Sequence, residues 1–232
     1  MHYALRITNY ELNYALLITN YELLKMFDSI IEVFSVILTA LYNLTDKAGF
    51  PSYGLAIILL TVIIKVALYP LTVKQLKSMK AMQKIAPELK KLQEKHKDNP
   101  QLVQQKMMAL YQREGINPLA GCLPLILQMP ILMAMYYALF NFDYATADPS
   151  FLWIENLSAP DSMYILPVIS AFTTWLQQKI SMTDVTPQAR IMMVVMPLFI
   201  GWISLTFPAG LVLYWATMNV VQIVQQLGVN RG

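Results

Sequence analysis

The feature that most constrains this chain is a series of apolar runs, each about as long as a bilayer core is thick. They cover residues 54–73, 119–142, 162–180, 190–206 and 210–228. A helix needs about 20 largely apolar residues to cross a hydrocarbon core of about 30 Å. Only 13% of the 232 residues are charged, whereas a soluble domain carries about a quarter. The sequence therefore predicts an all-α membrane protein with five transmembrane helices.

Charged residues are distributed unequally between the predicted loops. Residues 74–114 hold ten Lys or Arg against four Asp or Glu, whereas residues 143–161 hold four acidic residues and no Lys or Arg. Short loops rich in Lys and Arg stay in the cytoplasm. The pattern predicts five alternating crossings, with the N-terminus outside and the C-terminus in the cytoplasm.

The basic segment, residues 74–117, has apolar residues at helical spacing on both sides of a break near Pro100. Pro100 suits the first turn of a helix and Gly115 favours a stop, so we expect a cytoplasmic helical hairpin. Its charges suit anionic lipid headgroups, and a docking surface for an RNA-rich or acidic partner is the second interpretation. The candidate contact residues are Lys84, Lys90, Lys91, Lys95 and Lys97.

Two further segments precede the apolar runs. Residues 1–25 contain YALRITNYEL and YALLITNYEL, with nine identities in ten positions. This repeat favours a translated DNA repeat ahead of a start at Met26 over a signal peptide, and we assign it no function. Residues 26–50 place apolar residues on one helical face and Asp28 and Glu32 on the other. Because the uninterrupted apolar stretch is short, we expect an amphipathic helix at the membrane interface.

Lys65 lies near the middle of the first predicted span. A lysine at a helix centre costs roughly 2.5–3.5 kcal/mol on insertion scales. Snorkelling recovers only part of the distance to the headgroups, so the sequence favours a lysine that faces water or a polar partner inside the membrane. The five predicted spans contain no Asp or Glu. We therefore expect an acidic segment from another molecule to be attracted to Lys65.

Polar residues recur at helical spacing in four of the spans. Such residues often only join helices, at about 0.6 kcal/mol each, but four stripes around one positive charge favour a shared hydrophilic groove. The stripes are Thr61 and Lys65 in the first span, Gly121, Pro124 and Gln128 in the second, Ser170, Thr174, either Gln177 or Gln178, and Ser181 in the third, and Trp215, Asn219, Gln222 and Gln226 in the fifth.

The sequence contains no motif for enzymatic or cofactor chemistry. Cys122 is the only cysteine, and His2 and His96 lie far apart, so we expect no disulfide and no metal site. P-loop, GxSxG and HExxH patterns are also missing from the sequence, and we expect neither enzyme activity nor a cofactor. Two alternatives stay open: a small-solute or ion transporter with Lys65 as its binding charge, and a passive membrane anchor for ribosomes.

Four segments resemble the YidC–Oxa–Alb family of membrane protein insertases. They are LTVIIKVALYPLTVKQ (60–75), MMALYQREGINPLAGCLPLILQMPI (107–131), FLWIENLSAPDSMYILPVI (151–169) and FPAGLVLYWATMNVVQIVQQ (207–226). The resemblance runs from about Met26 to the C-terminus, and makes residues 51–232 the five-span core. It implies an insertase and chaperone of the bacterial cytoplasmic membrane. Its positively charged groove would receive hydrophilic parts of client proteins and release their apolar spans into the lipid.

The same resemblance implies roles for single residues and partners. Lys65 stands at the basic groove position, where many relatives have arginine, and it lacks the planar fork of arginine. Thr61, Gln128, Gln178 and Trp215 correspond to groove-lining positions. Family members use no nucleotide. The partners that the resemblance implies are nascent membrane-protein clients, membrane lipids, the ribosome and the Sec translocon, and DNA is not expected as a partner. Because the sequence shows no long basic C-terminal tail, the hairpin is the expected ribosome contact.

Overall fold

The computed structural model describes residues 25, 27–117, 123–140, 149–181 and 187–231. A helix over Phe27–Lys47 comes first. It is followed by α2 (Tyr53–Ala67), α3 (Tyr69–Lys95), α4 (Pro100–Arg113), α5 (Leu123–Phe140), α6 (Ile165–Ser181), α7 (Pro187–Ser204) and α8 (Ala209–Arg231). The only β pairing within the described residues is an isolated bridge between Phe151 and Ile154. The all-helical fold is as predicted.

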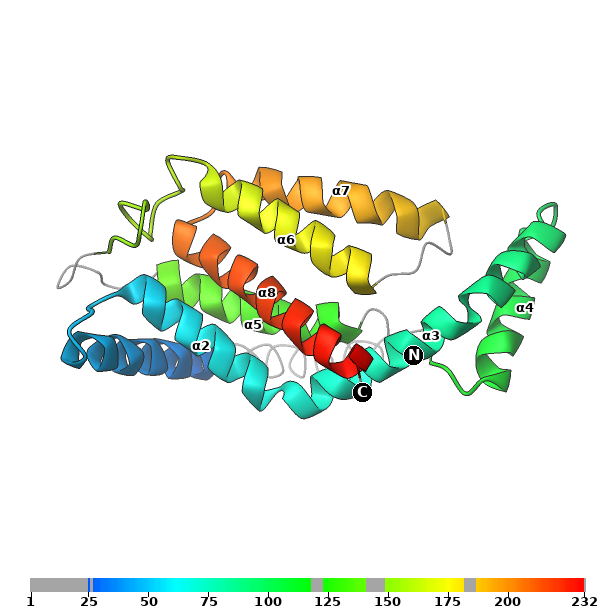
Figure 1. Cartoon of the computed structure of the whole chain (residues 1–232), viewed down its shortest axis with the longest axis horizontal. Coiled ribbons are helices and arrows are strands. Elements are labelled where there is room, and N and C mark those ends of the chain that lie inside the picture. The colour runs from blue at the N-terminus through cyan, green and yellow to red at the C-terminus, as the bar shows by residue number, and fades with distance from the viewer. Residues whose placement is uncertain (1–24, 26, 118–122, 141–148, 182–186, 232) are drawn as a thin grey trace, which may run out of the picture.

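Helix α8 is central to the bundle. It contacts α2, α5 and α6, while α6 lies along α7 (Figure 1). Helices α2, α5, α6, α7 and α8 run alternately in opposite directions along the long axis of the molecule (Figure 1). One end of the bundle carries the connection 149–164, and we call it the loop end. At the other end α3 and α4 project away, and we call it the hairpin end.

The first predicted span, 54–73, is divided in the structure. Helix α2 ends at Ala67 and α3 begins at Tyr69, with a bend of 67° between them. Pro70 is the physical reason, because it has no N–H to donate and its ring collides with the carbonyl four residues earlier. Helix α2 therefore ends six residues before the end of the predicted span, and α3 then continues without interruption into the hairpin.

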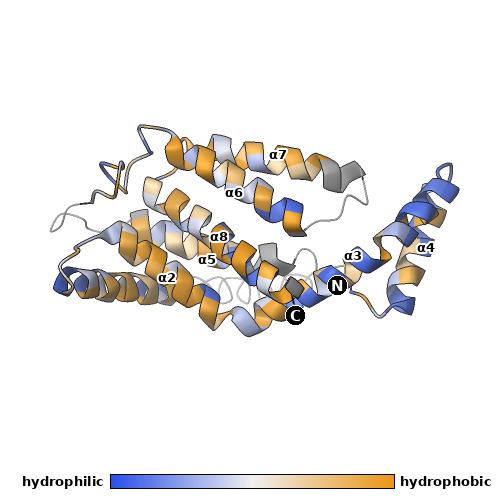
Figure 2. Ribbon diagram, in the orientation of Figure 1, coloured by the Kyte–Doolittle hydropathy of each residue, from blue (hydrophilic) through white to orange (hydrophobic). Residues whose placement is uncertain are grey.

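Helices α3 and α4 form the predicted hairpin, which carries most of the strongly hydrophilic ribbon (Figure 2). Ile85, Leu89 and Leu110 are buried between the two helices. Pro100 occupies the first turn of α4, and Gly115 follows the helix with a φ of 64°, both as predicted. Nη2 of Arg113 donates to both carboxylate oxygens of Glu88, at 2.9 and 3.1 Å, and so joins α4 to α3. This hydrogen bonding raises the pKa of Arg113.

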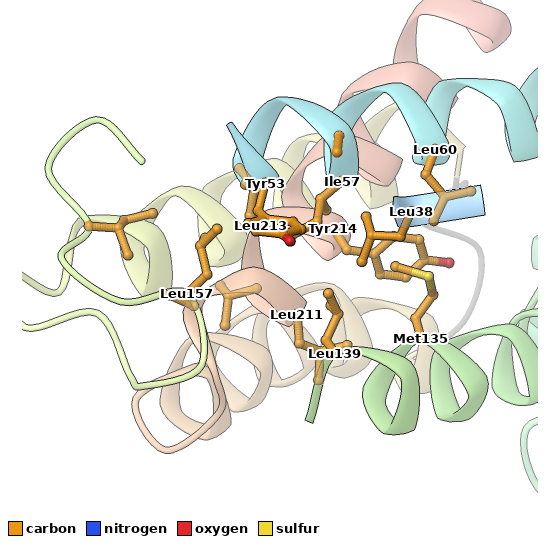
Figure 3. Packing of buried hydrophobic residues seen from close by; sticks show 14 of the residues in the cluster. Leu38, Tyr53, Ile57, Leu60, Met135, Leu139, Leu157, Leu211, Leu213 and Tyr214 are labelled. Carbon is orange, nitrogen blue, oxygen red and sulfur yellow. The ribbon is translucent and has the colours of Figure 1, made fainter. Parts of the chain in front are cut away.

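An apolar core lies between α2, α5, α8 and the helix Phe27–Lys47 (Figure 3). Tyr214 of α8 is 1% exposed, and the rings of Tyr42 and Tyr53 stack with centroids 4.0 Å apart. The core also contains Leu38, Ile57, Leu60, Met135, Leu139, Leu157, Leu211 and Leu213 (Figure 3). These contacts fix α2 against α8 and so determine where Lys65 lies.

Length and hydropathy alone identify few spans among the described residues. Phe27–Lys47 is long and apolar enough to cross a membrane, the bent pair α2 and α3 qualifies if it is counted as one span, and Ile191–Ser204 is a shorter apolar helix. The count of five spans and the interfacial position of residues 26–50 stay predictions. The repeat in residues 1–24, Gly121 and Cys122 lie outside the described residues.

Candidate functional site

Lys65 lies in the last turn of α2, facing α8. Its ammonium Nζ donates a hydrogen bond to Oε1 of Gln222 at 2.7 Å. Its backbone oxygen accepts one from Nε2 of Gln225 at 3.1 Å. We call these three residues the Lys65 cluster. Within the described ranges, the ion pairs lie in the hairpin and do not include Lys65. The hydrogen-bond partner of its half-buried ammonium is the neutral side-chain amide of Gln222.

Thr61 lies one turn before Lys65 and is only 1% exposed. Its hydroxyl donates to the backbone oxygen of Ile57 in the same helix, at 2.7 Å. Such a bond within a helix satisfies the hydroxyl locally. A role for Thr61 in lining a groove stays a prediction.

Polar side chains join α6 to α8. Trp215 donates from Nε1 to Oγ1 of Thr174 at 3.0 Å, and Asn219 donates from Nδ2 to the same oxygen at 2.9 Å. Nearer the hairpin end, Gln226 accepts from the hydroxyl of Ser181 at 2.6 Å and donates to the Ile180 oxygen at 3.0 Å. Much of the polar stripe predicted in the third and fifth spans therefore holds these two helices together.

The two predicted glutamines differ in their partners. Gln128 donates from Nε2 to the hydroxyl of Tyr214 at 2.8 Å and so joins α5 to α8. Gln178 has a buried Oε1 without a hydrogen-bond partner, as do Nε2 of Gln75 and Oε1 of Gln225. Most buried polar atoms in proteins are hydrogen-bonded. The hairpin end thus contains buried amide groups with unused capacity for hydrogen bonds.

The five candidate lysines of the hairpin are all exposed, on α3 and in the turn that follows it. The lysines are Lys84, Lys90, Lys91, Lys95 and Lys97. The hairpin ion pairs use Arg113 with Glu88 and Glu114, and include none of these lysines. They form a basic surface distinct from the Lys65 cluster.

The connection 149–164 covers the loop end and caps α8. The N–H groups of Ala209 and Gly210 donate to the backbone oxygens of Ala159 and Leu157, at 2.8 and 2.9 Å. Asp161 is 3% exposed and accepts from the N–H groups of Met163 and Leu166, at 3.1 and 2.7 Å. These bonds satisfy groups that a helix start leaves unpaired.

Sequence reasoning missed Gln225 and Gln75. Gln225 lies about 60° around the helix from Gln222, outside the stripe that contains Trp215 and Asn219. The glutamine-rich end of α8 in the sequence, QIVQQ at residues 222–226, was the available signal. Gln75 lies beyond the bend, in a segment that the sequence assigned to the basic loop.

Fold and site together define a class: an apolar helical bundle in which side-chain amides hold a basic residue between helices. Residues 43–232 match the family model described as "60Kd inner membrane protein". The chain belongs to this family, which is the one that its motifs resemble.

Named relatives agree with that assignment. The chain is 44% identical to the membrane protein insertase YidC of Geobacter sulfurreducens over 181 residues, or 78% of this chain and 34% of the relative. It is 44% identical to the membrane protein insertase YidC of Oceanobacillus iheyensis over 203 residues, or 81% of this chain and 79% of that relative. The chain thus spans about a third of the Geobacter relative and most of the Oceanobacillus one.

A solved structure shares the fold. An active YidC insertase, crystallised with its first transmembrane domain resolved, matches with a TM-score of 0.68 and 27% sequence identity. The match covers 83% of this chain and 45% of the crystallised one.

Proposed function

We propose that this chain is a membrane protein insertase and chaperone of the bacterial cytoplasmic membrane. Its family membership supports this, as does the name that its relatives share. In this proposal α2, α5, α6, α7 and α8 are the five spans, with the N-terminus outside. Their alternating directions (Figure 1) and the basic segment 74–114 support that topology.

The observation that carries the mechanism is the partner of Lys65. Its ammonium contacts the neutral amide oxygen of Gln222, and so the charge is held in place without being neutralised. An ammonium has three N–H donors, and two stay available for a carboxylate that enters from outside the protein. Attraction between opposite charges at 4 Å amounts to about 4 kcal/mol at an effective dielectric constant of 20.

In the proposed mechanism, a client places its short hydrophilic segment in a groove between α2, α5, α6 and α8. Lys65 attracts its carboxylates, and the unpaired amide atoms of Gln75, Gln178 and Gln225 replace part of its lost hydration. The apolar span of the client then moves into the lipid. Burial of its surface drives this step, at about 25 cal/mol per Å².

The exposed hairpin lysines serve in this proposal as the contact for ribosomes and anionic headgroups, with the Sec translocon as a further partner. Their position on a helix pair that projects from the bundle supports this role (Figures 1 and 2). Phosphate groups of RNA and lipid headgroups are both anionic, so the same surface suits either.

Replacement of Lys65 tests the proposal directly. In an insertase-depleted strain, Lys65→Ala should insert a client with an acidic outer segment at least about tenfold less efficiently, because it loses the charge attraction. Lys65→Arg should preserve insertion, and Lys106→Ala is the matched control, because it removes an equal charge from the exposed face of α4 without touching the five contact lysines. Equal insertion of the acidic client by Lys65→Ala and the unaltered protein would rule out the charge mechanism.

Purified protein in liposomes separates this function from solute transport. An insertase integrates an added client without solute flux, whereas a transporter moves solutes in the absence of a client. Flux that depends on Lys65, without client insertion, would overturn the proposal.

A further inference from the structure

The bend between α2 and α3 leaves the Lys65 carbonyl without its helical partner. In a continuous helix this oxygen would accept from the N–H of Tyr69. Here α2 ends at Ala67, and the last N–H group that bonds back into it is that of Leu68, which donates to the oxygens of Ile64 and Val66. The Lys65 oxygen accepts from the side chain of Gln225, at 3.1 Å. A residue of α8 therefore caps the last turn of α2.

The neighbouring turn of α8 holds the other end of the same lysine. Gln222 precedes Gln225 by three residues, so both project from adjacent positions on one side of α8. Oε1 of Gln222 accepts from the ammonium of Lys65 at 2.7 Å. Hydrogen bonds to a charged group are shorter and stronger than neutral ones. Backbone and ammonium of Lys65 are thus both fixed to α8.

We propose that Gln222 and Gln225 are positioning residues that hold the Lys65 ammonium in place and keep its charge available to acidic clients. This inference rests on the proposed insertase function. The neutrality of Gln222 is essential, because a carboxylate in its place would pair with the ammonium and compete with the client. Gln225 acts through the backbone, by fixing the direction in which the last turn of α2 presents Lys65.

Insertion of two matched clients provides the test. One client has an acidic outer segment, and in the other each Asp and Glu of that segment is replaced by Asn and Gln. The readout is the ratio of their insertion in the depleted strain. For Gln222→Glu we expect the acidic-to-neutral ratio to fall roughly tenfold. For Gln225→Leu we expect a fall of roughly threefold, because the lysine is displaced but keeps its charge.

Gln226→Leu is the matched control. Gln226 also makes two hydrogen bonds from the same helix, but both go to α6 and neither reaches Lys65. Its loss should lower thermal stability and leave the acidic-to-neutral ratio unchanged. Gln222→Leu separates charge from hydrogen bonding, since it releases the ammonium without neutralising it and should lower the ratio less than Gln222→Glu.

The outcomes distinguish this inference from the function on which it rests. If Lys65→Ala leaves the ratio unchanged, the proposed charge mechanism itself fails. If Lys65→Ala lowers the ratio while Gln222→Glu and Gln225→Leu behave like Gln226→Leu, the positioning role fails and the charge mechanism stands.

Discussion

The loop end and the hairpin end of the bundle are built from the same helices but differ in how fully their buried polar groups are hydrogen-bonded. At the loop end, Asp161 receives hydrogen bonds from two backbone N–H groups, and the connection caps the first N–H groups of α8. At the hairpin end, Lys65 has a neutral partner. Three buried glutamine atoms there have no partner.

This difference indicates which end can accept a polar segment. A buried group that already has its hydrogen bonds gains little from a new partner, whereas an unpaired one pays a desolvation cost that a new partner removes. In the mechanism that we propose, a hydrophilic client segment would therefore gain more stabilisation from new hydrogen bonds at the hairpin end. The loop end instead gains stability from fixed contacts. Substitutions at each end should separate stability from client handling.

The largest expected effect is at Gly54, because the Phe151 ring leaves no space for a side chain at this position of the loop end. A Cβ on Gly54 would collide with Cγ of the Phe151 ring. Gly54→Ala must displace that ring and should cost about 3 kcal/mol of stability. Thermal unfolding in detergent, followed by circular dichroism, measures the loss.

Gly228→Ala is the control for Gly54→Ala. A Cβ on Gly228 meets nothing within 4 Å, and alanine is favoured over glycine in helices by about 0.8–1.0 kcal/mol. Unfolding of Gly228→Ala should occur at an equal or higher temperature than in the unaltered protein. Similar losses in both variants would show that the loop end is no more tightly packed than the C-terminal part of α8.

Asp161 should give the next largest effect. Asp161→Ala removes the acceptor for the N–H groups of Met163 and Leu166, and an unsatisfied buried donor costs about 1–3 kcal/mol. Limited proteolysis of the connection 149–164, at increasing temperature, measures its release. Asp161→Asn keeps one acceptor oxygen and should show an intermediate effect. A proteolysis profile of Asp161→Ala like that of the unaltered protein would contradict the capping role.

Much of this fold could be predicted from residues that act locally. Apolar run lengths, Pro100 and Gly115 gave the helices and the hairpin because each acts within one or two turns of its own position. The separation of α2 from α3 near Leu68 was harder to predict, since Pro70 is compatible with either one kinked span or two helices. Tertiary contact with α8 is what satisfies the carbonyl that the bend exposes.

The candidate site could be predicted only in part. Lys65 stood out because a charge in an apolar run has few explanations. Its partners did not, because the pairing of Lys65 with Gln222 joins residues 157 positions apart. Periodicity also could not tell which polar residues join helices and which stay unpaired. Trp215 and Gln178 follow the same pattern in the sequence, but Trp215 of α8 donates to Thr174 of α6, whereas Oε1 of Gln178 has no hydrogen-bond partner.

A smaller effect is expected where α6 and α8 are joined. Trp215→Phe removes the bond to Thr174 and should cost about 0.6 kcal/mol, with an upper limit near 1.7 kcal/mol. Trp202→Phe is the matched control, because Trp202 is 66% exposed on α7. Tryptophan fluorescence is altered in both variants, so helix unfolding should be measured by circular dichroism. A loss in Trp202→Phe equal to that in Trp215→Phe would contradict a specific contribution of this bond.

The smallest effect should come from the hairpin ion pair, which lies outside the bundle. Arg113 contacts Glu88 at 2.9 Å, and their side chains are 61% and 48% exposed. Salt weakens ion pairs that are this exposed to solvent. Glu88→Gln should speed hydrogen exchange of α3 and α4 amides at low salt, and the difference should vanish near 1 M salt, where the screening length is about 3 Å. Lys106→Gln is the control, since it also changes one hairpin charge while leaving the Arg113 pair intact. A difference that persists at high salt would contradict a contribution from the charge of Glu88 and would assign its effect to the hydrogen bonds with Arg113.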